Sequence, residues 1–302
     1  VYSEAEAWDY FGQGSPLALM VKAAIEQSPY LAELWCCPLA EAVAGVVSTG
    51  TITAAISSLT SGTLYLYVGR HVLTIGISED DTAVTIAAAI AIAMNAAGWL
   101  PLVATTPTTA VVTIKSRTKG TTGNGWLLAY EYTGTGLTLT VVPQASGATD
   151  PDIQDALDAA LPAQFDLIAV DRSVGTDIDD VIDHLETVSG PMEQRPGTAY
   201  FGYVGSVATA VTLANGRNSG RVVMPYMRGT RTHPIELAAA MAAAVAAEDD
   251  RARPLNGIEL KVGVSPDDLA DRLTRTEQES CLANGVCCLE VGGQDKVKIV
   301  RS

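Results

Sequence analysis

Two patterns of apolar and polar positions divide the chain. Between residues 47 and 149, short runs rich in Thr, Ser and β-branched residues are separated by turn residues, as in a partly exposed sheet. The runs at 63–68 and 72–77 are typical. On either side of this stretch, continuous apolar runs alternate with segments of helical period. The change of pattern predicts a β-rich domain at 47–149, inserted into an α/β core made of residues 1–46 and 150–302.

One helix interrupts the strands of the inserted stretch. Asp80 or Asp81 can serve as its N-cap, and Gly98 would end it. Apolar residues at helical spacing define one face of the helix, and further runs of strand type follow it. The helix face is Ile86, Ile90, Ala93, Met94 and Ala97, and the further strands are expected near 110–116, 126–132 and 137–142.

Strands and helices alternate in the flanking core. Ser15 and Pro16 are typical of a helix start, with Ser as the N-cap and Pro at the first helical position. The run at 166–170 is almost continuously apolar, as in a strand that is buried on both faces. Such alternation predicts an α/β layer with a largely parallel sheet. The expected strands are 34–39, 166–170, 198–204 and 220–226, and the expected later helices are 151–161, 177–188, 207–215 and 236–248.

The final segment of the chain combines a helix stop with two β-rich runs. A short helix that includes Thr276 ends at an Asn-Gly pair, because Gly readily takes the left-handed conformation of a C-cap. A strand follows at 286–291, and a second run of strand type starts at Lys296. Because that run stops in mid-pattern and the chain begins with Val1, we expect a protein from which both terminal arms are missing.

The charge of the chain argues against nucleic acid as a partner. Its 302 residues include 34 Asp and Glu against 19 Lys and Arg, a formal net charge of -15. A nucleic-acid-binding protein typically shows the opposite sign or a basic stripe. The densest basic stretches, 217–231 and 251–253, are short and interrupted, which favours solvated loops or subunit contacts. Apolar runs such as 86–97 are too short and too rich in Ala to insert into a membrane.

The five cysteines predict small, buried, reduced side chains. A secreted disulfide scaffold would be denser in Cys. A zinc site would normally show a CxxC pair or a nearby His, and the His residues lie far away in sequence. We therefore expect synthesis in the cytosol and no metal ion. The residues concerned are Cys36, Cys37, Cys281, Cys287 and Cys288, with His71, His184 and His233.

No motif for catalysis or cofactor binding stands out. The segment 12–17 has the first two glycines of a dinucleotide loop but lacks the third, which favours a simple helix start. Walker loops, GxSxG elbows and HExxH motifs do not occur. Acidic pairs such as Asp179-Asp180 suit the first turns of helices. His184 is interpreted as a solvated side chain and His233 as a turn residue. We expect no catalytic residue, no cofactor and no metal.

Several residue runs, taken together in order, resemble the Mu-like class of contractile phage tail sheath proteins. Each run alone has a plain role as a cap, strand or turn, so their order and spacing carry the resemblance, which extends over nearly the whole chain. The last run is similar to the segment that leads into the C-terminal arm in that family. The runs are FGQGSPLALMVK at 11–22, GTLYLYVG at 62–69, LP at 100–101, KGTTGN at 119–124, RPL at 253–255, NGV at 284–286 and VKIVR at 297–301.

The resemblance implies a structural role in a virion. Sheaths of this class form stacked hexameric rings around an inner tube, and their contraction drives the tube through the host envelope. It implies other sheath subunits, the tail tube protein, and baseplate and tail terminator proteins as partners, with assembly in the bacterial cytoplasm. Neighbouring subunits would be linked by terminal arms that add strands to each other's sheets. The arms expected for such linkage are those that we expect to be missing here.

Charge complementarity suggests which residues meet between subunits. Acidic helices such as 177–186 could face basic segments such as 217–231 of a neighbour, which would accommodate the net negative charge. Exposed ion pairs contribute only about 0–1 kcal/mol each, so many repeats would be needed to set a register. The candidate contacts are Arg217, Arg221, Arg228, Lys296, Lys298 and Arg301.

Two other functional classes remain open from the residues. The chain could be a hydrolase whose site lies at the carboxyl ends of the α/β strands. It could also be a carbohydrate- or receptor-binding virion protein that uses aromatic residues of the β-rich domain. The aromatic candidates are Tyr65, Tyr67, Trp126 and Tyr132. A pocket with converging polar groups and perturbed pKa values would favour the enzyme, and unpaired strand edges near both termini would favour the sheath.

Overall fold

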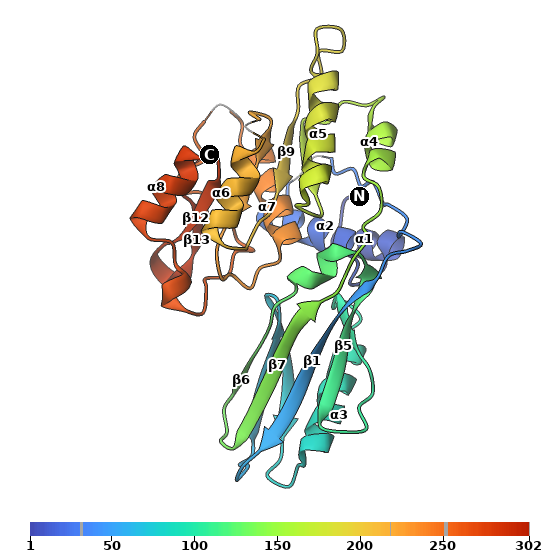
Figure 1. Ribbon diagram of the computed structural model, residues 1–302, viewed down its shortest axis with the longest axis vertical. Helices are drawn as coiled ribbons and strands as arrows, with labels where there is room; N and C mark the ends of the chain where they lie inside the picture. Colours follow the sequence, from blue (N-terminus) through green and yellow to red (C-terminus); the bar gives the residue numbers. More distant parts are fainter. Residues whose placement is uncertain (31–32, 218, 251–252, 302) are drawn as a thin grey trace. The chain divides into compact units, whose positions relative to one another are not determined.

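A computed structural model describes residues 1–30, 33–217, 219–250 and 253–301. The chain has a mixed α/β fold, which confirms the expected class, and it divides into two compact units (Figure 1). Unit 1 comprises Val1–Phe11, Leu17–Leu39 and Asp152–Ser302, and unit 2 comprises Gly12–Pro16 and Ala40–Pro151. None of the described helices is both long and apolar enough to cross a bilayer.

Unit 2 contains two antiparallel sheets. The larger has the strand order β4-β5-β1-β7, with β1 (Val47–Ile56) paired on both sides and its residues alternately buried. The smaller has the order β3-β2-β6. Only the pairs β2·β3 and β4·β5 join consecutive strands, and β1 pairs with β5 and β7 from much later in the chain. The other strands are β2 (Gly62–Val68), β3 (His71–Ile77), β4 (Leu102–Ala104), β5 (Val111–Lys119), β6 (Leu128–Tyr132) and β7 (Leu137–Ala145).

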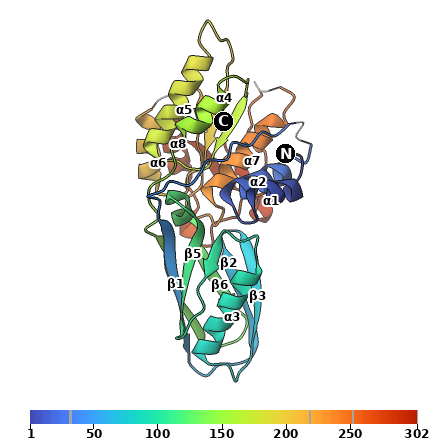
Figure 2. The same ribbon diagram turned by 90° about the vertical axis from the view of Figure 1, so that its right-hand side faces the viewer.

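The helix α3 (Ala83–Ala96) packs against strands of both sheets (Figure 2). Its N-cap is Thr82, whose hydroxyl accepts a hydrogen bond from the backbone N–H of Thr85. The expectation of an aspartate cap was wrong. Asp81 instead accepts a hydrogen bond from the Thr85 hydroxyl, because a capping box already occupies the first turn. The buried face is Ile86, Ala87, Ile90, Ala91 and Met94.

Unit 1 contains parallel strands, as expected, together with one antiparallel pair. The strands β8, β9 and β10 are parallel in the order β10-β9-β8, and β11 lies parallel to β12. A single bridge from Tyr203 to Tyr226 links the two sets. The last strand, β13, runs antiparallel to β12. The bounds are β8 (Leu167–Val170), β9 (Thr198–Phe201), β10 (Val222–Val223), β11 (Pro225–Tyr226), β12 (Cys287–Val291) and β13 (Val297–Ile299).

The helices of unit 1 surround these strands. The largest buried share belongs to α7 (Pro234–Ala246), which packs against β8, β9 and β11. At its start the chain approaches Gly202, where an added Cβ would lie 1.8 Å from the carbonyl oxygen of Pro234. Only Gly fits there. The other helices are α1 (Glu4–Phe11), α2 (Pro16–Gln27), α4 (Gln154–Ala160), α5 (Gly175–Val188), α6 (Val207–Asn215) and α8 (Arg275–Ala283). Short 3-10 turns lie at Leu269–Asp271 and Gly293–Asp295 in unit 1 and at Thr121–Gly125 in unit 2.

Some sequence expectations for unit 1 were wrong. Residues 34–39 form no strand among the described residues, and they are half-buried or exposed. The run at 220–226 is broken into two short strands, and 198–204 is a strand only as far as Phe201. In β8, Val170 is buried and the other three residues are half-buried, so the strand is not covered on both faces. An apolar run is compatible with a strand, but the segments that can pair with it and cover it decide its conformation and burial.

Candidate functional site

Arg217 joins two helices of unit 1. It follows α6, and its guanidinium donates hydrogen bonds to the carbonyl oxygens of Leu213 in α6 (3.0 Å) and Gly175 at the start of α5 (2.7 Å). It also donates to Asp179 Oδ2 at 3.0 Å. The planar guanidinium can bind several acceptors at once, because its N–H donors point in several fixed directions. Arg217 therefore fixes the end of α6 to the first turn of α5.

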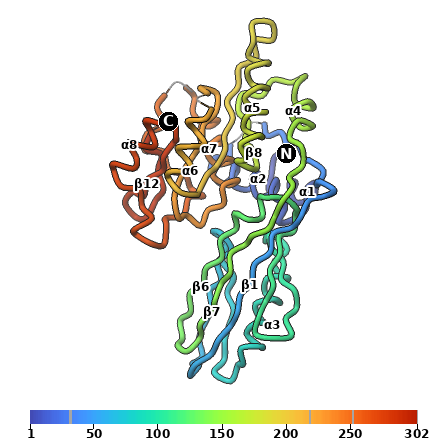
Figure 3. Tube along the Cα trace, in the orientation of Figure 1, coloured from blue at the N-terminus to red at the C-terminus, as the bar shows by residue number. Residues whose placement is uncertain are grey.

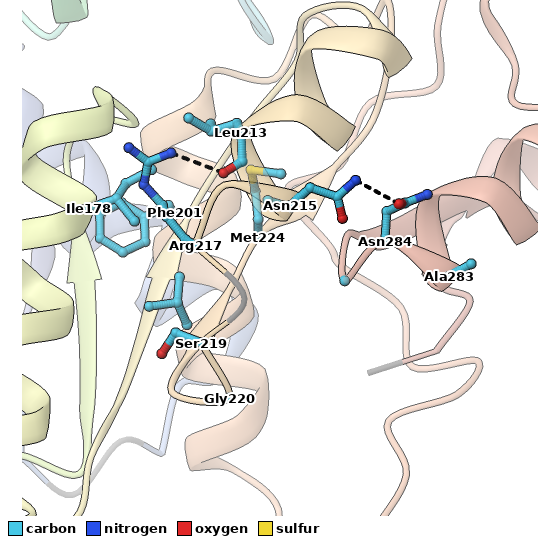
Figure 4. Close-up of a pocket in the computed structure, with 13 residues that line it drawn as sticks. Ile178, Phe201, Leu213, Asn215, Arg217, Ser219, Gly220, Met224, Ala283 and Asn284 are labelled. Carbon is cyan, nitrogen blue, oxygen red and sulfur yellow. Dashed lines mark hydrogen bonds between the residues drawn. The ribbon is translucent and has the colours of Figure 1, made fainter.

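Beside Arg217 lies a small pocket, shown in Figure 4. Its volume is about 230 Å³, and its lining comes from α5, β9, α6, β10 and the end of α8. Asn215 at the exposed end of α6 donates a hydrogen bond to Asn284 Oδ1 at 2.7 Å, which joins α6 to the end of α8. The buried residues Ile178, Phe201 and Met224 form its base, with Leu213 and Val222, and the polar residues are Asn215, Arg217, Ser219 and Asn284.

Arg228 holds the start of α8. Its guanidinium donates to Glu277 Oε1 at 2.8 Å and to the carbonyl oxygen of Ala270 at 3.0 Å. Glu277 also accepts hydrogen bonds from the backbone N–H and the hydroxyl of Thr274, which completes a capping box. The Thr274 N–H first, and the Arg228 guanidinium next, lower the pKa of Glu277 from 4.5 to about 2. The same contact raises the pKa of Arg228.

The helix α8 ends as its sequence predicts. Gly285 has φ of +79°, and the N–H of Val286 donates to the carbonyl oxygen of Cys281 at 3.0 Å. These features define a Schellman C-cap, so the Asn-Gly stop is confirmed. The chain then enters β12, and its C-terminal segment returns beside α8 and β12 (Figure 3).

The strand β13 is bonded along both of its edges. It pairs with β12, and on its other side the Leu260 N–H donates to Val297 O at 2.9 Å. The Ile299 N–H donates to the carbonyl oxygen of Ile258 at 3.0 Å. β13 therefore does not present the unpaired strand edge that would have favoured the sheath over the enzyme. Edge strands that could accept another chain must be sought elsewhere, since backbone groups that are already paired offer no site.

The six candidate contact residues do not form one site. Three of them are engaged within the chain, because Arg217 and Arg228 bind as described and Lys296 Nζ lies 2.8 Å from Glu259 Oε2. The side chains of Arg221, Lys298 and Arg301 have no hydrogen bond or ion pair with the residues that the structure describes. Arg221 lies beside the pocket, and Lys298 and Arg301 lie along β13 and just after it. Of the basic stretch 251–253, residues 251 and 252 lie outside the described residues.

The histidines and two of the cysteines differ from expectation. His233 is buried and is the N-cap of α7, where its Nδ1 accepts a hydrogen bond from the Ile235 N–H at 3.3 Å. His184 is half-buried, and burial lowers its pKa. Cys37 is exposed and Cys36 is half-buried, because the segment expected to be a buried strand is not one. Cys281, Cys287 and Cys288 are buried as expected, and burial raises the pKa of Cys287 to about 12.

The glycine segment 12–17 packs closely against the backbone at Leu100. Gly14 has φ of +75°, and an added Cβ would lie 2.3 Å from the carbonyl oxygen of Leu100. This close approach accounts for the glycine without a phosphate. Within the described ranges, no group of three or more His, Cys, Asp or Glu residues is placed to hold a metal ion.

Exposed aromatic side chains occur where sequence reasoning did not place them. Trp126 is buried, and Tyr65, Tyr67 and Tyr132 are half-buried on their sheets. The aromatic residues that are well exposed all lie in the first 35 residues. Tyr30 lies in a turn three residues after the end of α2, where no helical period explains an aromatic side chain. An aromatic residue outside any helix or strand pattern was the signal in the sequence that could have identified Tyr30 as exposed. The exposed set is Tyr2, Tyr10, Tyr30 and Trp35, at 77%, 69%, 93% and 69% exposure.

Comparison with known proteins gives one clear relative. No family model matches the chain. Over 309 aligned residues the chain is 28% identical to the Mu-like prophage FluMu tail sheath protein of Haemophilus influenzae, and the alignment covers 99% of this chain. The chain is a homologue of that tail sheath protein. It spans 62% of its relative's length. The resemblance inferred from the order of short residue runs is confirmed.

Two solved structures resemble this sheath homologue more distantly. The sheath tail protein of Desulfitobacterium hafniense is 12% identical, with a TM-score of 0.42 over 93% of this chain and 61% of that one. The flagellar cap protein FliD of Escherichia coli is 13% identical, with a TM-score of 0.18 over 70% of this chain and 76% of that one. At TM-scores below 0.5, neither resemblance establishes the fold.

Proposed function

We propose that the chain is a structural subunit of the sheath of a Mu-like contractile phage tail. In this role it polymerises as stacked hexameric rings around the tail tube, and contraction of the sheath drives the tube through the host envelope. The protein is a virion component that is assembled in the bacterial cytoplasm, and it carries out no catalysis. Its partners are other sheath subunits, the tail tube protein, and the baseplate and tail terminator proteins.

One observation carries the proposal. The similarity to a tail sheath protein extends over 99% of this chain, and therefore over both units and the segments that join them. A shared local motif could be explained by a common turn or cap. Similarity along nearly the whole length requires that the same elements follow one another in the same order. The mixed α/β fold is compatible with that relationship.

The free basic residues are the better candidates for contacts between subunits. Arg221, Lys298 and Arg301 have no side-chain partner among the described residues, whereas Arg217, Arg228 and Lys296 are already bound within the chain. Replacing Arg217 or Arg228 by Glu would break hydrogen bonds within the subunit. A loss of tubes could then result from an unstable subunit as well as from a lost contact between subunits. Arg221→Glu, Lys298→Glu and Arg301→Glu are therefore the appropriate changes.

Electron microscopy of the full-length protein tests the function. We expect hollow tubes with a helical or ring repeat, and we expect the triple variant at residues 221, 298 and 301 to form fewer or shorter tubes while remaining folded. A full-length protein that stays monomeric in the presence of tail tubes would refute the proposal. Normal tubes from the triple variant would refute only the role given to the three basic residues.

A further inference from the structure

The pocket beside Arg217 and the side chain of Tyr30 are complementary in size. The pocket holds about 230 Å³, below the roughly 300–1,000 Å³ of typical small-molecule sites. A cavity of roughly 150 Å³ is enough for one benzene ring. A single phenol side chain therefore fits, whereas a larger metabolite does not. Tyr30 lies in the turn three residues after α2 ends at Gln27, and its side chain is 93% exposed.

The two features are also complementary in chemistry. The pocket has an apolar base that includes Ile178 and Phe201, and polar groups at its mouth such as Asn215. A tyrosine suits such a site because its ring is apolar and its hydroxyl needs a polar partner. Charge agrees as well. The exposed Glu33 follows Tyr30 closely in sequence, and the half-exposed Arg221 lies beside the pocket with no ion-pair partner among the described residues.

The positions of the two features require a second copy. Both belong to unit 1, and α7 lies between the α1–α2 pair and the end of α8 in Figures 1 and 2. Tyr30 is not among the residues that line the pocket, and its side chain is 93% exposed, so it does not occupy the pocket of its own chain. A projecting apolar group that matches a pocket elsewhere on the same molecule produces a head-to-tail contact, which forms a ring or a helical filament.

We propose that Tyr30 of one subunit inserts into the pocket between α5, α6, β10 and the end of α8 of the next subunit, with Glu33 facing Arg221 across the contact. The contact rests on the proposed sheath function for its biological setting, and it names a surface through which the subunits meet. Buried aromatic anchors of this type usually dominate the binding energy of an interface, and the surrounding charges set specificity.

Cross-linking between two chains that each carry one exposed cysteine tests the contact. One chain carries Pro29→Cys, which keeps Tyr30, and the other Ala283→Cys at the exposed edge of the pocket. Both also carry Cys36→Ser and Cys37→Ser, so that each has one exposed cysteine beside the buried Cys281, Cys287 and Cys288. A short bis-maleimide should give a dimer of twice 31.5 kDa only when the two chains are mixed. The control is Met192→Cys, which is also 93% exposed. A yield no higher than that of the control would overturn the contact.

Substitutions test the energetics of the same contact. Tyr30→Ala should lower the self-association constant of the chain at least about tenfold. Sedimentation at high concentration, without cross-linker, measures this constant. Ala283→Phe should do the same by filling the pocket, whereas Ser280→Phe on the same helix should not. Glu33→Arg and Arg221→Glu should each weaken association and together restore it. Failure of that restoration would overturn the pairing of these two residues.

Tube formation by the full-length protein separates this contact from the proposed function. Normal tubes from a full-length Tyr30→Ala variant would overturn the contact and leave the sheath function standing. Absence of tubes from the wild-type protein, with a specific cross-link between the two mixed cysteine variants, would overturn the sheath function and support the contact.

Discussion

Units 1 and 2 differ strongly in their content of charged residues. Unit 2 has 6 acidic and 4 basic residues, a net charge of -2, whereas unit 1 has 28 acidic and 15 basic residues, a net charge of -13. The ion pairs that fix helix ends, at Arg217 and at Arg228, lie in unit 1. The candidate subunit contacts lie there too. Unit 2 is instead a set of antiparallel strands with an uncharged helix, α3, packed on them.

The difference teaches that the two units depend on different contacts. The strands of unit 2 pair largely with neighbours from one continuous stretch of chain. Unit 1 joins segments from both sides of that stretch, for example where Gln27 donates to the carbonyl oxygen of Glu259 at 2.9 Å. We therefore expect unit 2 to be a removable insertion and unit 1 to carry assembly. The predictions below can break or sharpen this division.

Deletion of the insertion is the largest change to the chain, and we expect unit 1 to stay folded without it. We expect a chain without residues 47–149, closed by a short flexible linker, to keep the near-ultraviolet circular dichroism of packed aromatic residues and to unfold cooperatively. The reason is that the pairing of β8 to β13 uses no strand of unit 2. A shortened chain with no cooperative transition would show that the units do not fold independently.

Phe201→Ala should be the most damaging single change in unit 1. Phe201 is fully buried in a cluster with Val181, Leu185 and Leu157. Truncation should lower the free energy of unfolding by roughly 3–5 kcal/mol, because it removes apolar burial and leaves a cavity. Urea denaturation measures the change. Met192→Ala, at a fully exposed position, should alter stability by no more than about 0.5 kcal/mol. Equal effects would argue against this core.

Gly14→Ala should destabilise unit 2 more than Gly12→Ala does. Both glycines have positive φ, +75° and +80°, which costs an alanine about 1–2 kcal/mol. Only Gly14 also meets a backbone atom, so its replacement should cost roughly 1–3 kcal/mol more. Thermal unfolding of the two variants measures the difference. Equal transitions would show that the approach to Leu100 is not tight.

Glu277→Gln should give the smallest effect, with a distinct pH dependence. Gln can keep the capping box but loses the charge that binds Arg228. Because the folded pKa of Glu277 lies below its ordinary 4.5, its stabilisation is complete above that pH and disappears as the pH falls towards about 2. The variant should lose about 1 kcal/mol or less at pH 7, since the pair is partly exposed.

A matched change separates this effect from general loss of charge on α8. Glu279→Gln removes an exposed carboxylate from the same helix, where it pairs only with Arg275 at 3.1 Å. Denaturation measured between pH 2 and pH 7 should show a reduced pH dependence for Glu277→Gln and almost none of that reduction for Glu279→Gln. Identical pH profiles for the two variants would contradict the bonding assigned to Glu277.

Local chemistry in the sequence predicted many elements correctly. Alternation identified β2 and β3, and the helical period identified α6 with its observed bounds. The Asn-Gly stop of α8 could also be predicted, because a left-handed C-cap depends on one residue. Such features are set by neighbours a few positions away. The order of short runs along the chain was sufficient to indicate the sheath family.

Features that depend on distant segments required the tertiary structure. Residues 34–39 have the composition of a strand, but the chain offers them no partner strand. The engagement of Arg217 by Asp179 and of Arg228 by Glu277 arises only when α6, α5 and α8 come together. The same is true of the pocket. The sequence thus determined helix caps, strand periods and family, because these are local or collinear properties, whereas folding decided which charges are satisfied and which aromatic residues remain exposed, because long-range packing sets both.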